Sequence, residues 1–327
     1  MFGDKTQPTY SKITKRRRIN IHHYVTEQEF YLLREKGLSI KEICKLVEFP
    51  STPLVLNKYA IKEGWNIGKK AKAVKACIDV NEDFFKEINR SSAWVYGWVV
   101  TDGSVQEKSG HIGIGLKSID KDVLYKIKNL MRFEGNIYDR TSRDGRKSST
   151  LRICRKSMCE DLFALGMARK DKTFNTTFPN ELPDDCYWDF IRGVFEGDGS
   201  VSHRTGNTDA LQVSICGATE SFIDELQRTL LERGVNTRKS CNRNGVYVIE
   251  CRSNADSLRM CYYMYANTTE QTRLNRKFAV FQNYVATYYD KVKRKSVPSI
   301  ELVELARQTI PECHEEFNAI STQKEAV

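Results

Sequence analysis

The sequence predicts an α+β protein built from two pseudo-symmetric αββαββα halves, with a small all-α domain before them. An apolar helical run that ends in Asp-Gly-Ser occurs twice, at residues 95–104 and 191–200. After each copy, alternating strand patterns and amphipathic helical patterns follow in the same order. Residues 1–80 show neither feature and contain short helical segments instead, so they form a separate part of the chain.

The composition points to a partner that carries negative charge. The 327 residues include 52 Lys and Arg against 42 Asp and Glu, a net charge of +10, and such an excess is typical of nucleic-acid binding. No apolar run reaches the roughly 18 residues of a membrane-spanning helix, and the N-terminus lacks the apolar core of a signal peptide. Ten cysteines without CxxC spacing argue against zinc and for reduced thiols. We therefore expect a protein that is not secreted and works in the cytoplasm, a nucleoid or an organelle matrix.

Residues 1–24 are expected to form a flexible basic arm. Residues 1–80 hold 16 Lys and Arg but only 8 Asp and Glu, so most of the excess charge lies outside the repeated part. The run at Lys15, Arg16 and Arg17 suits contact with DNA phosphates, and a solvated arm is the alternative. A second basic stretch, residues 68–80, is predicted to be a linker.

Residues 25–67 are predicted to fold as three short helices. Thr26 and Glu29 have the spacing of a capping box at the start of the first helix, which Gly37 ends. Pro53 takes the first position of the third helix. The segment that begins at Gly37 resembles the opening of a helix-turn-helix of the resolvase type, which implies a third helix in the major groove. A three-helix bundle with no role in DNA binding is the alternative.

The two repeated helical runs are predicted to pack closely against each other. Gly97 and Thr101 are four residues apart, as are Gly193 and Gly197, so each pair lies on one helix face. Faces with almost no side chain allow two helix backbones to approach closely. Close packing also explains why each helix accepts a central glycine, which costs roughly 1 kcal/mol relative to alanine.

Each run ends in an aspartate, Asp102 or Asp198, followed by a glycine that is expected to cap the helix. If the helices are parallel, the two carboxylates arrive at the same level and repel each other at the negative helix ends. A divalent cation between them relieves this repulsion. One Asp-Gly pair alone would indicate only a turn, but two copies 96 residues apart indicate a shared site.

The strands and helices after each run follow one plan. Strands are predicted at residues 103–106, 111–117, 136–140 and 150–154 in the first half, and at 200–203, 210–216, 237–242 and 246–251 in the second. The helices that separate and close these hairpins are predicted at residues 120–131, 156–165, 220–233 and 254–265. This order implies a pseudo-twofold architecture.

These residues resemble the LAGLIDADG homing endonucleases of the single-chain, two-motif kind, over about residues 81–289. The resemblance implies two halves, residues 81–180 and 181–290, that meet at the motif helices. It further implies that Asp102 and Asp198 bind divalent metal, which we expect to be Mg²⁺. The motif letters are degenerate, since Val100 and Glu196 stand where the family name has its first Asp.

The same resemblance assigns a basic residue near each scissile phosphate. By position these are Lys172 and Lys277, with Lys170 as a rival for the first. Solvated surface lysines are the alternative. Lys117 at the end of its strand is given a similar role, without a counterpart in the second half.

One face of each sheet must cover its own helices, and the other face alternates polar and basic residues. Such a set on two curved sheets suits a groove for duplex DNA. For any one of these residues alone, a solvated strand face is the simpler interpretation. The residues assigned to DNA contact are Lys117, Arg140, Arg152, Arg155, Arg204, Arg238, Lys239 and Arg252.

The function predicted from these features is site-specific, metal-dependent cleavage of both strands of a long, non-palindromic DNA target by a monomer. The alternatives are a non-cleaving DNA-binding regulator of the same fold and an intron RNA maturase. In non-cleaving relatives the metal aspartates are typically lost, whereas both remain here. An intein does not fit, because residue 1 is not Cys or Ser and no terminal His-Asn is present. Residues 291–327 are expected to be a helical tail that frays, with no recognisable chemistry.

Overall fold

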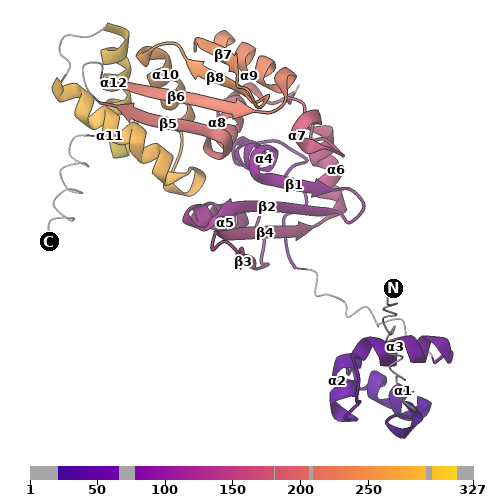
Figure 1. The fold of residues 1–327 in the computed structure, drawn as a ribbon. Helices are drawn as coiled ribbons and strands as arrows, with labels where there is room; N and C mark the ends of the chain where they lie inside the picture. The colour runs from indigo at the N-terminus through magenta and orange to yellow at the C-terminus, as the bar shows by residue number, and fades with distance from the viewer. Residues whose placement is uncertain (1–20, 66–77, 180, 206–208, 292–296, 315–327) are drawn as a thin grey trace, which may run out of the picture. The chain divides into compact units, whose positions relative to one another are not determined.

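The computed structural model describes residues 21–65, 78–179, 181–205, 209–291 and 297–314. The chain divides into two compact units, Met1–Cys77 and Ile78–Val327, and each is described by itself (Figure 1). Among the described residues, no helix is both long enough and apolar enough to cross a membrane.

The first unit contains three helices around its own apolar core, as predicted. They are α1 (Glu27–Glu35), α2 (Ile40–Leu46) and α3 (Pro53–Lys62), preceded by the 3-10 helix η1 (Ile21–His23). Complete capping boxes at Thr26 and Ser39 satisfy the first amides of α1 and α2. Ile21 and Val25 are buried in the core with Phe30, so the folded part begins within the segment expected to be a flexible arm.

The second unit contains the two predicted αββαββα halves. The first half consists of α4 (Arg90–Asp102), β1 (Gly103–Gln106), β2 (His111–Lys117), α5 (Lys121–Leu130), β3 (Ile137–Thr141), β4 (Lys147–Cys154) and α6 (Lys156–Ala164). The second half consists of α8 (Tyr187–Asp198), β5 (Gly199–Arg204), β6 (Ala210–Gly217), α9 (Glu220–Glu232), β7 (Thr237–Cys241), β8 (Tyr247–Cys251) and α10 (Asn254–Tyr265). The predicted fold class is confirmed.

Each half has a four-stranded antiparallel sheet with the same strand order, β1-β2-β4-β3 in the first and β5-β6-β8-β7 in the second. Successive side chains of a strand point to opposite faces, and one face of each sheet is buried under helices. On β2, Ile112, Ile114 and Leu116 are buried, while Gly115 and Lys117 are exposed on the other face. We call these other faces the uncovered faces.

The helices α4 and α8 touch along their backbones, as the spacing of small residues predicts. A Cβ atom on Gly97 would lie only 2.6 Å from the carbonyl oxygen of Phe190 and 2.7 Å from the Cα of Gly193. Further along, Gly197 faces Thr101. Because residue numbers rise together on both helices along the contact, the helices are parallel, and their C-terminal ends lie side by side.

The glycines after the two aspartates end their helices, as predicted. Gly103 and Gly199 are the C-cap residues of α4 and α8, and both have extended backbones (φ −90° and −94°) and begin strands β1 and β5. Space explains the requirement for glycine, because a Cβ on Gly103 would lie 2.6 Å from the Cα of Val99. In each half, the chain therefore passes directly from helix to strand after the aspartate.

Three further helices flank the halves: α7 (Lys172–Asn175), α11 (Asn275–Lys291) and α12 (Val297–Thr309). The helix α12 belongs to the main core, where Val303, Ala306 and Ile310 are buried. This stretch is helical, as expected for the start of the tail, and its apolar residues at i, i+3 and i+7 form a buried stripe. Of the remaining tail, residues 315–327 lie outside the described part of the chain.

Candidate metal and nucleic-acid site

The parallel helix ends bring Asp102 and Asp198 to one place. A Cβ on Gly197 would lie 2.8 Å from the Oδ2 of Asp102, so the Asp102 carboxylate lies against α8 one residue before Asp198. The Thr101 hydroxyl donates a hydrogen bond of 3.2 Å to the same oxygen. The predicted meeting of the two carboxylates follows directly from the contact of Gly97 with Gly193.

Both carboxylates are held in surroundings that disfavour their charge. Burial raises the pKa of Asp102, and the charges of Lys172 and Lys277 oppose this rise. Burial also raises the pKa of Asp198, and the negative charge of Asp102 adds to that rise. Mutual repulsion of this kind is relieved when a cation binds between carboxylates.

The donor set fits a hard divalent cation. Carboxylate oxygens are preferred ligands of Mg²⁺, which usually keeps several waters and takes other ligands from substrate phosphates. Within the described residues, no group of three or more His, Cys, Asp or Glu side chains could hold a metal by itself. A cation at Asp102 and Asp198 would therefore depend on water and phosphate to complete its coordination.

Lys172 of α7 lies at the C-terminal end of α4. Its Nζ donates hydrogen bonds to the carbonyl oxygens of Thr101 (2.6 Å) and Gly103 (2.7 Å), on either side of Asp102. Burial lowers the pKa of Lys172 to about 8, although the charges of Asp102 and Asp198 work against this. A hollow of about 270 Å³ is lined by both Lys172 and Asp198. The rival Lys170 is exposed.

Lys277 of α11 occupies the matching position at the end of α8, but it is more deeply enclosed. Its Nζ donates to the carbonyl oxygens of Phe195 (2.7 Å), Glu196 (2.7 Å) and Gly199 (2.6 Å), which uses all three of its N–H groups. The side chain is only 5% exposed. Burial lowers its pKa to about 8, and the neighbouring Arg276 contributes to the decrease.

Each of the two helices that carry these lysines contacts the other half through a polar interaction. Arg276, beside Lys277, makes a two-pronged ion pair with Asp120 of the first half, with distances of 2.6 and 2.9 Å. On the other side, the Thr219 hydroxyl of the second half donates a hydrogen bond of 2.8 Å to the carbonyl oxygen of Thr173. Sequence reasoning missed these contacts, because nothing in either residue pair marks a partner roughly 50 to 160 positions away.

A buried glutamate, Glu196, lies next to Lys277, and the first half has no equivalent beside Lys172. Glu196 accepts hydrogen bonds from the indole Nε1 of Trp94 (2.7 Å) and the amide of Leu274 (2.8 Å), so it connects α4, α8 and the chain entering α11. Burial raises its pKa. The position is occupied by Val100 in the first half, where no such connection is possible.

Five of the basic residues predicted to contact DNA lie exposed on the uncovered faces. In the first half, the Arg152 guanidinium stacks over the Tyr138 ring at 5.9 Å and lines a hollow of about 590 Å³ together with Asp102. This hollow connects the uncovered face directly with the paired aspartates. The five residues are Lys117, Arg140, Arg152, Arg204 and Arg238.

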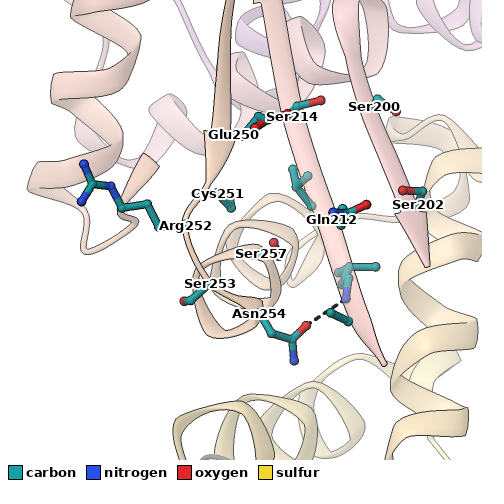
Figure 2. A pocket seen from close by; sticks show the side chains of 13 residues that line it. Ser200, Ser202, Gln212, Ser214, Glu250, Cys251, Arg252, Ser253, Asn254 and Ser257 are labelled. Carbon is teal, nitrogen blue, oxygen red and sulfur yellow. Dashed lines mark hydrogen bonds between the residues drawn. The ribbon is translucent and has the colours of Figure 1, made fainter. Parts of the chain in front are cut away.

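The other predicted residues are placed differently from these five. Lys239 follows Arg238 on β7 and therefore points to the helix-covered side, where it bonds Glu220 of α9 at 3.1 Å. Arg155 forms an ion pair of 2.7 Å with Glu82. Arg252 is exposed and lines a hollow on the uncovered face of the second sheet, but its Nε donates a hydrogen bond of 3.1 Å to the carbonyl oxygen of Thr237 and its side chain points away from β5 and β6 (Figure 2). The predicted residues Lys15, Arg16 and Arg17 lie outside the described part of the chain.

The first unit exposes one face of α3. Leu54, Lys58 and Ile61 lie along this face at i, i+4 and i+7 and are all exposed, as are Val55 and Lys62 beside them. The opposite face, with Leu56 and Ala60, is buried in the core. An exposed stripe of aliphatic and lysine side chains suits contact with thymine methyl groups and phosphates.

A family model described as a LAGLIDADG-like domain matches this chain twice, at residues 90–164 and 185–264. No curated protein matches it significantly.

Several solved structures resemble the fold. The homing endonuclease I-DmoI in complex with DNA and Ca is 15% identical, with 62% of this chain and 99% of that chain covered and a TM-score of 0.41. The LAGLIDADG homing endonuclease I-GzeII in complex with its DNA target is 13% identical, with coverages of 68% and 98% and a TM-score of 0.44. Full-length DUF199/WhiA from Thermatoga maritima is 15% identical, with coverages of 69% and 70% and a TM-score of 0.41.

Proposed function

The chain is a member of the LAGLIDADG-like family with two such domains in one polypeptide, and we propose that it is a site-specific DNA endonuclease. In this proposal it hydrolyses one phosphodiester bond in each strand of a long duplex, with Mg²⁺ as cofactor. The observation that carries the proposal is the meeting of Asp102 and Asp198 at the ends of two helices whose backbones touch. Because the two halves differ in sequence, the target is not a palindrome.

The residues of the site have distinct roles in this reaction. Asp102 and Asp198 hold the cation, which neutralises phosphate charge and activates water when bound. Lys172 and Lys277 place positive charge at the same helix ends, where it stabilises the negative charge that develops on the phosphate. Each lysine is fixed by backbone carbonyls of its motif helix, so the charge needs no rearrangement during the reaction.

Duplex DNA is the proposed partner, bound along both uncovered faces. Lys117, Arg140 and Arg204 are exposed there and make no hydrogen bond or ion pair with other described residues, so they are available to phosphates. One chain already supplies both halves, and we propose that it acts as a monomer. The first unit is proposed to be a separate DNA-binding module that extends the recognised site through α3.

Cleavage of a defined target tests the proposal. The full chain is incubated with Mg²⁺ and a plasmid that carries the sequence flanking its own gene, joined without the gene. We expect a linear product from the native protein. Asp102→Asn and Asp198→Asn should each abolish double-strand cleavage and leave specific binding nearly intact, because they remove metal ligands and keep the shape of the site.

Asp224→Asn is the matched control, because Asp224 lies on α9 and is paired with Lys239 on the helix-covered side of the sheet. It should cleave like the native chain. Full double-strand cleavage by either site variant would contradict a shared catalytic centre.

A non-cleaving DNA-binding regulator is the second candidate, favoured by the exposed lysine and aliphatic stripe on α3. The same experiment separates the two functions. Tight, sequence-specific binding without any nick in either strand at millimolar Mg²⁺ would support the regulator.

A further inference from the structure

The uncovered face of the second sheet contains a hollow with a floor of polar side chains. The hollow has a volume of about 380 Å³ and is lined by Ser200 and Ser202 of β5, Gln212 and Ser214 of β6, and Glu250 of β8. Figure 2 shows these side chains arranged across the three strands. Because β5 begins at the residue after Asp198, a duplex cut at the aspartates must pass over this floor.

The strand registers assign each position on this floor a counterpart in the first half. In the first sheet, Ser104 pairs with Gly113, which pairs with Arg152. In the second sheet, Ser200 pairs with Ser214, which pairs with Glu250. Ser104 and Ser200 each lie two residues after an aspartate of the site. Glu250 therefore occupies the position that Arg152 occupies in the first half.

A carboxylate at this position requires a chemical reason. Facing the phosphates of a duplex, an exposed glutamate is repelled, and replacing it by a neutral residue would strengthen non-specific binding. Glu250 is 49% exposed and is oriented by Arg238, whose guanidinium donates a hydrogen bond of 3.2 Å to its Oε2. The short side chains of Ser200 and Ser214 leave its carboxylate accessible from the groove side.

We propose that Glu250 determines specificity for a cytosine in the half of the target that lies over the second sheet. This inference rests on the proposed DNA-binding function. In the major groove, the N4 amino group of cytosine donates a hydrogen bond that a carboxylate can accept. Arginine instead donates to the two acceptors of guanine, O6 and N7. At equivalent positions the two sheets then recognise the two different bases of a G·C pair, cytosine through Glu250 and guanine through Arg152.

The test measures base preference separately from cleavage. The background is the full chain carrying Asp102→Asn and Asp198→Asn, and affinity is measured on the target and on all of its single base-pair variants. Adding Glu250→Gln should lower the preference for cytosine at least tenfold at one base pair and favour adenine there, because glutamine pairs with adenine N6 and N7. Preferences at other base pairs should stay unchanged.

Glu232→Gln is the matched control. Glu232 is 52% exposed and paired with Arg228 at 2.8 Å, but it lies at the end of α9 on the covered side of the sheet. Its base preferences should equal those of the background. A uniform rise in affinity with Glu250→Gln on all sequences, or no change at any base pair, would overturn the assignment of Glu250. Absence of sequence-specific binding by the background protein would instead overturn the proposed function.

Discussion

The two halves of the second unit share one fold but hold their lysines differently. Lys277 lies on a helix of 17 residues, and all three of its N–H groups donate hydrogen bonds to carbonyl oxygens at the end of α8. Lys172 lies on a single helical turn of four residues and donates to two carbonyl oxygens. Its third N–H has no partner among the described residues. In the proposed reaction, the lysine of the first half thus keeps an N–H donor for the phosphate, while that of the second half can act only through its charge.

The difference shows which features the repeat keeps and which it varies. The helix contact, the aspartates and a lysine at each helix end are the same in both halves. The surroundings of these groups differ: Glu196 replaces Val100, Glu250 replaces Arg152, and only the second half is covered by α12. The same catalytic groups are therefore held by different neighbouring residues in the two halves. Substitutions at equivalent positions should for this reason have unequal effects.

The largest effect is expected where the halves are alike. Gly193→Leu should lower the free energy of unfolding by about 3 kcal/mol, the upper end of the usual overpacking cost, because even a Cβ would lie 2.9 Å from the Cα of Gly97. Gly97→Leu should cost as much, since the contact is reciprocal. Urea unfolding of the full chain measures both. Gly115→Ala is the control, because its Cβ would meet only the Thr150 hydroxyl at 3.6 Å. Native stability in Gly193→Leu would show that the helices do not touch there.

Substitution of Lys277 should mainly lower stability, whereas substitution of Lys172 should mainly lower activity. Lys277→Met leaves three buried carbonyl oxygens without a donor and should cost about 2–3 kcal/mol, since unsatisfied buried groups cost roughly 1–3 kcal/mol. Lys172→Met should cost only about 1 kcal/mol but should slow cleavage at least a hundredfold. Unfolding and single-turnover cleavage are measured on both variants. Equal losses of stability would remove the proposed difference between the halves.

The pH dependence of stability tests the surroundings of both lysines. The folded pKa of Lys172 and Lys277 is about 8, below the ordinary value of about 10.4 for an unfolded chain. Between these values the unfolded chain binds more protons, so the free energy of unfolding should rise from pH 8 to pH 10. The double variant Lys172→Met, Lys277→Met should lack this rise, as measured by urea unfolding at each pH. An identical slope in both proteins would show that the lysines titrate normally.

The sequence predicted that the two helix ends meet, because its signals are local and repeated. Small residues four apart and an aspartate at each helix end require no knowledge of distant parts of the chain. It predicted individual DNA-facing residues less well, because a shift of one residue reverses the face of a strand. Arg238 and Lys239 are neighbours on β7 and cannot share a face, and the alternation alone could have separated them.

Long-range partners were the features that the sequence did not reveal. The Arg276–Asp120 pair joins residues of opposite halves, and Glu196 connects α4 with the start of α11. Charged residues on loops and helix starts are usually solvated, so no local pattern distinguishes these from the rest. The role of Glu250 appears only when the registers of the two sheets are compared.

The smallest effect on the two halves is expected from removal of the first unit. Residues 1–77 form a compact unit with its own core, and none of the site residues lies in it. A chain that begins at Ile78 should therefore keep its stability and its Mg²⁺-dependent cleavage. Its DNA affinity should fall about tenfold, and the logarithm of its affinity should depend less steeply on salt, because fewer phosphate contacts release fewer counterions.

The footprint gives the decisive measurement, because one module attached to a pseudo-twofold body can extend the protected DNA on one side only. We expect protection to shorten at that side and stay unchanged at the other. Leu54→Ser in the full chain tests whether α3 itself contacts DNA, because it alters the exposed face of α3 and keeps the module. Leu54 is 59% exposed and contributes little to the core. It should weaken binding to the outer part of the site while leaving the fold intact. If truncation changes neither the footprint nor the salt dependence, the first unit is a three-helix bundle with no role in DNA binding.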